Sequence, residues 1–194
     1  MTFKETQQYF QKKLSDLYST DEINHLFNIL AEHYCGLSKL QVILQQKSDI
    51  EQIILDKFIR ASERLYVHEP IEYIIKTANF YGYNFIVSPA VLIPRPETEE
   101  MLKYIEENFL QNISKDFAIL DVGTGSACIA ISLKRIFPKA KIVATDISEE
   151  ALQIAKQNAD LHQVEITFEQ LDMHASPPLW FEKKFDIIVS NPPY

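Results

Sequence analysis

An aspartate and two closely spaced glycines lie beyond the middle of this 194-residue chain, in the sequence Asp-Val-Gly-Thr-Gly-Ser-Ala at residues 121–127. Residues 117–122 are mostly apolar and predict a buried strand, and an apolar pattern with helical spacing follows the turn. Glycines between a strand and a helix let a ligand approach the backbone closely. The dinucleotide fingerprint would require a third glycine at position 128, where this chain has Cys128. The turn therefore predicts a ligand site, and its spacing counts against NAD.

This turn resembles the D-x-G-x-G motif of class I methyltransferases, whose cofactor is S-adenosyl-L-methionine. That cofactor carries no pyrophosphate, so a third glycine at the start of the helix is less important. The family's own G-T-G-T/S-G loop usually has a third glycine at the position of Ala127, where a small residue should be tolerated. The resemblance implies that the cofactor contacts Asp121, Gly123, Thr124, Gly125, Ser126 and Ala127.

Two further acidic residues follow predicted strands in register with the glycine turn. Asp146 ends the segment at residues 141–146, where a carboxylate can accept hydrogen bonds from both ribose hydroxyls. Asp172 follows the segment at residues 164–168. The resemblance places Asp172 near the adenine amine and Met173 against the adenine ring. Each acid alone is more often a solvated loop residue, but together with the turn both are predicted cofactor ligands.

The sequence Asn191-Pro192-Pro193-Tyr194 follows another predicted strand. It resembles the N/D-P-P-Y/F motif of methyltransferases that act on planar, amide-like nitrogens. An amide nitrogen is almost non-basic, because its lone pair is delocalised into the carbonyl group. The resemblance implies that Asn191 and the Pro192 carbonyl accept the two N–H bonds of the substrate and stabilise the charge that develops on nitrogen. Tyr194 would pack on the planar substrate group, Pro193 would line the same substrate site, and Asn191 would also border the cofactor.

The sequence Ile-Pro-Arg-Pro-Glu-Thr-Glu at residues 93–99 resembles the I-P-R-P-x-T-E signature of HemK-type enzymes. Those enzymes methylate the glutamine of the GGQ tripeptide in peptide chain release factors, and the resemblance covers essentially the whole chain. Ribosomal-protein glutamine methyltransferases are similar but typically read P-R-S-P at this point. The residues Arg95, Pro96 and Glu97 therefore favour release factors as protein substrates, with Arg95 as a predicted substrate contact.

Alternative functions remain open at this stage. A ribosomal-protein glutamine methyltransferase or an adenine-N6 nucleic-acid methyltransferase would share the Asn-Pro-Pro-Tyr motif. Against a nucleic-acid substrate, the chain has 19 basic and 27 acidic side chains, and its net charge of −8 repels a polyanion. We therefore expect no direct nucleic-acid partner. A fragment that binds cofactor or partner without turnover is a further alternative.

The elements that must position these residues fall into two groups. Apolar residues with helical spacing predict a helical bundle over residues 1–69, with Thr20 and Ser48 as N-caps and Gly36 at a helix end. The resemblance implies that this bundle helps to recognise the substrate. Residues 70–96 are rich in aromatic residues and prolines and predict a hairpin and linker.

The remaining residues, 97–194, predict the cofactor-binding domain. A helix is expected from Pro96 to about residue 110. Strands then alternate with helices, which indicates an α/β fold with a parallel sheet covered on both faces. The expected architecture is a helical bundle followed by a Rossmann-like methyltransferase domain. The expected strands are residues 117–122, 141–146, 164–168 and 185–190, and the expected helices between them are residues 126–137 and 149–161.

The composition favours a cytoplasmic protein without a metal site. Cys35 and Cys128 are far apart and lack metal-site spacing, which indicates a reducing compartment. The five histidines are scattered without ligand spacing. No stretch is long and apolar enough to predict a membrane span, so no membrane association is expected.

The C-terminal end of the sequence carries one more expectation. The family continues beyond the Asn-Pro-Pro-Tyr motif, so the parallel sheet is expected to be incomplete in this chain. The strand at residues 185–190 would then lie on an open edge with unpaired backbone groups. We expect the chain by itself to self-associate and to turn over slowly, and whether it is a natural product is left open.

Overall fold

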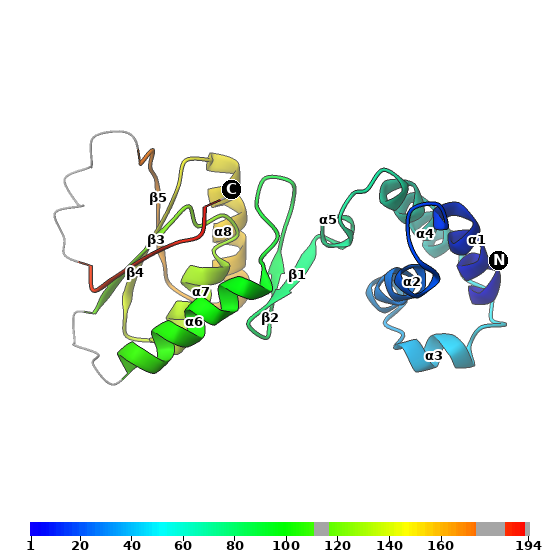
Figure 1. Cartoon of the computed structure of the whole chain (residues 1–194), viewed down its shortest axis with the longest axis horizontal. Coiled ribbons are helices and arrows are strands. Elements are labelled where there is room, and N and C mark those ends of the chain that lie inside the picture. The colour runs from blue at the N-terminus through cyan, green and yellow to red at the C-terminus, as the bar shows by residue number, and fades with distance from the viewer. Residues whose placement is uncertain (111–116, 174–184, 193–194) are drawn as a thin grey trace. The chain divides into compact units, whose positions relative to one another are not determined.

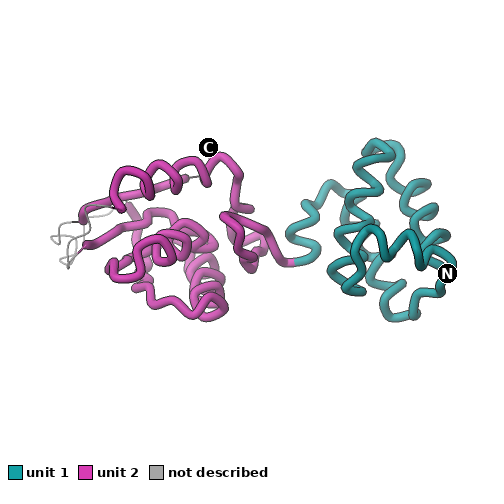
Figure 2. The backbone as a smooth tube through the Cα atoms, turned by 90° about the horizontal axis from the view of Figure 1, so that it is seen from below, with its two compact units in different colours: residues 1–75 teal, residues 76–194 magenta. Residues whose placement is uncertain are grey.

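The computed structural model describes residues 1–110, 117–173 and 185–192, which form two compact units. The first unit comprises residues 1–75 and the second residues 76–194 (Figure 2). The division falls inside the segment 70–96 that the sequence identifies as hairpin and linker. Its first residues form a short helix of the helical unit, and its hairpin belongs to the α/β unit.

The first unit is entirely helical among its elements, as the periodicity predicts (Figure 1). Its second helix begins at a capping box in which Ser19 and Glu22 exchange side-chain hydrogen bonds with each other's backbone, so the predicted cap Thr20 is the first helical residue. Gly36 ends that helix with φ 67°, as expected for a C-cap glycine. The helices are α1 (Phe3–Leu14), α2 (Thr20–Cys35), α3 (Lys39–Leu44), α4 (Gln52–Tyr66) and α5 (Ile71–Ile75).

Three phenylalanines from three helices form the centre of this unit. Phe10 of α1, Phe27 of α2 and Phe58 of α4 are fully buried. The rings of Phe27 and Phe58 stack with centroids 5.1 Å apart, and Phe10 meets both edge-on at 5.4 and 6.0 Å. Aromatic pairs in these geometries add to the stabilisation from burial alone. The unit therefore has its own hydrophobic core.

The second unit contains a four-stranded parallel sheet and a separate antiparallel hairpin. The sheet order is β5-β4-β3-β6, so the chain starts in the middle, extends to one side and returns to the other. The elements are β1 (Thr77–Phe80), β2 (Tyr83–Ile86), α6 (Pro96–Phe109), β3 (Ala118–Val122), α7 (Cys128–Ile136), β4 (Lys141–Asp146), α8 (Glu149–His162), β5 (Thr167–Gln170) and β6 (Ile187–Ser190).

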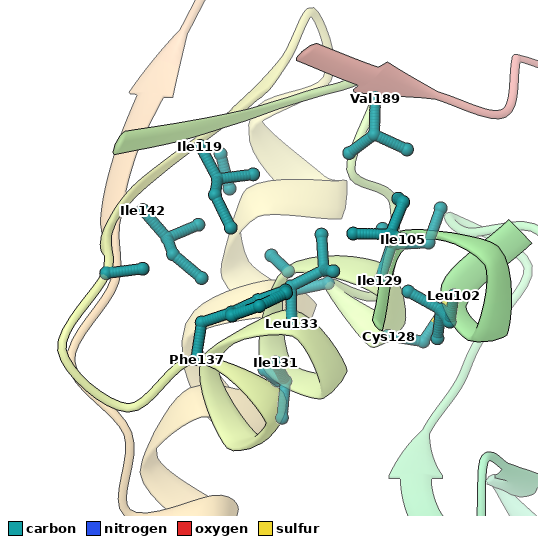
Figure 3. Packing of buried hydrophobic residues seen from close by; sticks show 14 of the residues in the cluster. Leu102, Ile105, Ile119, Cys128, Ile129, Ile131, Leu133, Phe137, Ile142 and Val189 are labelled. Carbon is teal, nitrogen blue, oxygen red and sulfur yellow. The ribbon is translucent and has the colours of Figure 1, made fainter. Parts of the chain in front are cut away.

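Helices α6, α7 and α8 pack on one face of this sheet. Ile119 and Ile142 project toward Leu133 and Phe137 of α7, and Val189 projects toward Ile105 of α6 (Figure 3). On the opposite face Ile188 is 61% exposed. Helices on both faces stay a prediction, because Leu120 on the same face as Ile188 is fully buried and residues 111–116 and 174–184 lie outside the described residues.

The hairpin is fixed to α6 and α8 by polar contacts. At its turn the backbone N–H of Tyr81 donates to Glu99 of α6 over 2.8 Å, and the Tyr81 hydroxyl donates to Glu106 over 2.7 Å. On its other side, Asn158 of α8 bonds the backbone of Ile86. These contacts explain why the hairpin belongs to the α/β unit.

No helix among the described residues is long and apolar enough to cross a membrane.

Candidate functional site

The strand register brings the carboxyl ends of three strands to one edge of the sheet. Val122, the last residue of β3, pairs with Thr145 of β4 on one side and Ser190 of β6 on the other. The Ser190 hydroxyl donates to the Val122 carbonyl over 2.8 Å. The glycine turn, Asp146 and Asn191 therefore follow adjacent strands at the same edge. Open parallel sheets bind their ligands at this edge.

The glycine turn has an alternating backbone conformation. Gly123, Gly125 and Ala127 have φ values of 70°, 54° and 62°, in the left-handed region. A Cβ atom at Gly123 would meet no atom within 4 Å. Glycine at position 123 is thus required by the backbone angle and not by crowding, and the space in front of it is open to a ligand.

Ala127 adopts the left-handed conformation without being a glycine, which costs about 1 kcal/mol or more. Its N–H donates to the Thr124 carbonyl over 2.8 Å, and the Thr124 N–H donates to the Thr145 carbonyl over the same distance. These bonds hold the turn against the end of β4. Because Ala127 is the N-cap residue, α7 begins at Cys128 and not at the predicted Ser126.

Asp121 lies beneath this turn and is fully buried. The Thr124 hydroxyl donates to its Oδ2 atom over 2.7 Å, whereas Oδ1 has no hydrogen-bond partner among the described residues. The pKa of Asp121 is raised to about 6: burial is the largest cause and the nearby Asp146 acts in the same direction, whereas the Thr124 hydroxyl and the backbone of Ala130 lower the pKa. Asp121 therefore supports the turn from below.

Asp146 faces the turn from the end of β4. Its Oδ2 atom accepts the Gly125 N–H over 2.9 Å, and its Oδ1 atom accepts the Ser148 N–H over 3.0 Å. A carboxylate has about four acceptor positions, so both oxygens keep capacity for further donors. A pair of ligand hydroxyls could use that capacity.

Asn158 is a site residue that the sequence reasoning missed. It is fully buried on α8, and its Nδ2 donates to the carbonyls of both Ser126 and Ile86 over 2.9 Å. Its Oδ1 accepts the Ile86 N–H over 2.7 Å. Asn158 thus connects the glycine turn to the hairpin. A polar residue at an apolar position of the helical pattern was the available signal.

The other predicted residues are less enclosed. Asp172 and Met173 follow β5 and are exposed, Met173 by 51%. Arg95 is the N-cap residue of α6 and is also exposed. Pro193 and Tyr194 lie outside the described residues, so their predicted roles have no structural counterpart here.

Asn191 is half-buried directly after β6, and Pro192 beside it is exposed. The Asn191 Nδ2 atom donates to the Thr98 hydroxyl over 2.8 Å. Thr98 lies in the first turn of α6 and is 7% exposed. This bond joins the Pro-Arg-Pro-Glu-Thr-Glu segment to the Asn-Pro-Pro-Tyr segment.

Within the described ranges, no three histidine, cysteine or acidic side chains are grouped as metal ligands would be. Oxygen acceptors and exposed backbone at the strand ends are the groups that the structure brings together there.

Comparison with known proteins gives the class of this site. A family described as "Methyltransferase domain" matches residues 113–193, and one described as "PrmC N-terminal domain" matches residues 5–75. Among solved structures, the N-terminal domain of human METTL16 superposes with a TM-score of 0.47 at 21% identity, covering 59% of this chain and 48% of that one. The second unit is a methyltransferase domain with the Rossmann-like parallel sheet that the sequence predicts.

Curated relatives define the family. A release factor glutamine methyltransferase of Flavobacterium psychrophilum is 38% identical over 100% of this chain and 68% of its own length. One of Bacteroides thetaiotaomicron is 40% identical over 96% of this chain and 65% of its own length. The chain thus spans about two thirds of these relatives. It belongs to the release factor glutamine methyltransferase family, as the resemblance of the two signature segments implies.

Proposed function

We propose that the protein containing this chain uses S-adenosyl-L-methionine to methylate the side-chain nitrogen of the GGQ glutamine in peptide chain release factors. The observation that carries this proposal is the position of Asn191. It follows β6 at the sheet edge that also carries the glycine turn, and its amide is held by Thr98. Asn191 thereby lies at the same sheet edge as the glycine turn in a member of this family, which supports the proposal.

The residues at the sheet edge fit the proposed cofactor. The open space at Gly123 admits a ligand against the backbone, and Asp146 keeps acceptor capacity for two ribose hydroxyls. Asp172 follows the next strand, where we assign it to the adenine amine with Met173 beside the ring. When bound, S-adenosyl-L-methionine supplies an activated methyl group on a sulfonium centre.

The substrate side of the site needs two hydrogen-bond acceptors. We assign these to Asn191 Oδ1 and the Pro192 carbonyl, which together would hold both N–H bonds of the glutamine amide. Holding both bonds fixes the plane of the amide and leaves the face of the nitrogen directed at the methyl donor. The same acceptors stabilise positive charge on the nitrogen before its proton leaves. Correct positioning contributes up to ~7–11 kcal/mol in ideal cases.

The protein substrate is assigned from the family and the signature segment. We place Arg95 at the release factor, because it is exposed at the start of α6, three residues before Thr98. Pro193 and Tyr194 complete the proposed substrate site. The first unit, which matches the PrmC N-terminal domain, is assigned to recognition of the release factor. We place the reaction in the cytoplasm, where release factors act.

Methyl transfer from labelled S-adenosyl-L-methionine to purified release factor tests the proposal. The full-length gene product should label wild-type release factor and should not label a variant whose GGQ glutamine is changed to glutamate, which has no amide nitrogen. Asn191→Ala should lower turnover about 10²-fold or more and affect cofactor affinity much less. Labelling of ribosomal protein or of DNA in place of release factor would assign a different substrate, and labelling of the glutamate variant would refute the target.

A further inference from the structure

Thr98 and Asn191 form a hydrogen bond between two signature segments that are far apart in the sequence. The bond runs from Asn191 Nδ2 to Thr98 Oγ1 over 2.8 Å. Thr98 is 7% exposed, so its hydroxyl is shielded from competing water. The backbone on the other side of Asn191 is also fixed, because Ser190 is paired with β3 and its hydroxyl bonds Val122.

The two ends of an asparagine amide have opposite chemistry. Nδ2 can only donate hydrogen bonds, and Oδ1 can only accept them. With Nδ2 directed at Thr98, the Oδ1 atom of Asn191 points to a different side of the amide and is available to a donor from the substrate. If the amide rotated by half a turn, a donor group would face the substrate N–H bonds and would repel them.

We propose that Thr98 is a positioning residue for amide methylation: its hydroxyl accepts from Asn191 Nδ2 and thereby keeps Oδ1 facing the substrate nitrogen. The inference rests on the proposed function, since it assigns a role to the same site. Thr98 touches neither cofactor nor substrate in this scheme. It acts only through the orientation of Asn191.

A threonine hydroxyl in a helix commonly donates its own proton to a backbone carbonyl three or four residues earlier. Thr6 of α1 shows this geometry in the same chain, with its hydroxyl 2.9 Å from the Thr2 carbonyl. When a hydroxyl donates its proton in this way, the lone pairs of its oxygen can still accept a hydrogen bond from an N–H group. In the structure the Thr98 hydroxyl accepts from Asn191 Nδ2; serine at position 98 could accept in the same way, and valine could not.

Two substitutions separate this role from simple packing. Thr98→Val keeps the shape of the side chain and removes the acceptor, whereas Thr98→Ser keeps the acceptor and removes a methyl group. For methylation of release factor by the full-length gene product, we expect Thr98→Val to lower kcat about 10-fold or more. Thr98→Ser should stay within about 3-fold of wild type, and the cofactor Kd of both variants, measured by calorimetry, should change by less than about 3-fold. A Thr98→Val enzyme with wild-type kcat would overturn the proposal, and so would a Thr98→Ser enzyme as slow as Thr98→Val.

A second measurement does not depend on activity. In a ¹⁵N-labelled protein, the side-chain N–H pair of Asn191 is identified as the pair that disappears in Asn191→Asp. We expect that pair to keep its position in Thr98→Ser and to shift and exchange faster with solvent in Thr98→Val. An unchanged pair in Thr98→Val would show that the hydroxyl does not hold the amide. If the wild-type enzyme methylates no amide, the proposed function fails, and the resonance still decides whether Thr98 orients Asn191.

A double substitution gives a third, internal check. The carboxylate that Asn191→Asp introduces has two acceptor oxygens and no donor, so it presents an acceptor in either orientation. The fold-decrease in kcat caused by Thr98→Val should therefore be smaller in the Asn191→Asp background than in wild type. Equal losses in both backgrounds would indicate that Thr98 acts through packing alone and would overturn the proposal.

Discussion

The buried carboxyl group of Asp121 makes the stability of the α/β unit depend on pH in an unusual direction. Asp121 is fully buried under the glycine turn and accepts a hydrogen bond from Thr124. Burial raises its pKa from an ordinary value of 3.8 to about 6. The folded state therefore holds the proton more tightly than the unfolded state does.

The sign of the effect follows from proton binding. Between about pH 4 and pH 6 the folded protein binds more protons at Asp121 than the unfolded protein, so raising the pH favours unfolding. This contribution to stability is fully present below the unfolded pKa and is lost as the pH rises through the folded pKa. The two pKa values differ by about 2, and each pKa unit corresponds to about 1.4 kcal/mol, so the charged carboxylate costs about 3 kcal/mol at neutral pH.

Asp121→Asn removes the charge and nearly preserves the shape. We expect the variant to equal wild type in the free energy of unfolding near pH 4 and to exceed it by up to about 3 kcal/mol at pH 7, less any loss from the altered hydrogen bond to Thr124. The chain has two compact units, so a probe inside the second is needed. Native-state hydrogen exchange of the β3 amides, compared between variants at the same pH, provides it.

Asp160→Asn is the matched control, because Asp160 is exposed on α8. It should change the exchange-derived stability by less than about 0.5 kcal/mol throughout the pH range. A difference between Asp121→Asn and wild type that stays constant from pH 4 to pH 7 would refute the reasoning, because it would show that Asp121 does not titrate in this range. A difference that falls with rising pH would show that the pKa of Asp121 is lower in the folded state than in the unfolded state.

Three further predictions concern other contacts. Asn158→Asp removes both donors of a buried amide, so it should lower the unfolding free energy of the second unit by about 3 kcal/mol and weaken cofactor binding. Gln157→Glu, on the exposed side of α8, is the control and should have neither effect. Thermal denaturation measures the stability, and calorimetry measures the cofactor affinity. Cys128 should react with a thiol reagent only on unfolding, because burial raises its pKa to about 12, and half-buried Cys35 should react first; mass spectrometry of the labelled peptides distinguishes the two. Ser19→Ala should destabilise the first unit by about 1 kcal/mol by removing the cap of α2, and an unchanged urea midpoint would contradict the capping assignment.

The parallel sheet can be predicted because its strands are continuous apolar runs. The segment 141–146 is β4 to the residue, and the strand before the glycine turn differs from β3 only in its first residue. The segment 164–168 is less accurate, since β5 covers Thr167–Gln170. The ends of β5 are set by its pairing with β4. That pairing begins where Val143 of β4 lies opposite Thr167 of β5. Propensity in the segment itself contains no information on that register.

The helix caps show a different limit. The sequence predicts Ser48 as a helix cap, but the fourth helix has Glu51 at its N-cap position without a side-chain bond. Met1 and Phe3 instead pair with the backbone around Ser48, which keeps it out of the helix. The short helices α3 and α5 escape prediction as well, because six and five residues are too few to show a helical period.

The polar contacts of the candidate site join residues that are far apart in the sequence, so they depend on the tertiary fold. Thr98 and Asn191 are 93 residues apart, and Asn158 is 72 residues from Ile86. Threonine and asparagine are common on protein surfaces, and only burial shows that the hydrogen bonds of these particular residues are committed. The aspartates are easier to predict, because a strand end followed by a turn fixes where such a side chain must lie.

In the proposed scheme, the contact between Thr98 and Asn191 lets one segment of the sequence serve two parts of the reaction site. The first turn of α6 is rigid, because Pro96 fixes the first helical residue and Glu99 is bonded to the hairpin turn at Tyr81. A rigid helix start transmits little motion to the side chain that it holds. The proline-rich segment therefore gives Asn191 a fixed partner, while Arg95, at the exposed N-cap of the same helix, remains available to a protein substrate. In the proposed scheme, substrate contact and amide orientation are set by neighbouring residues of one helical turn.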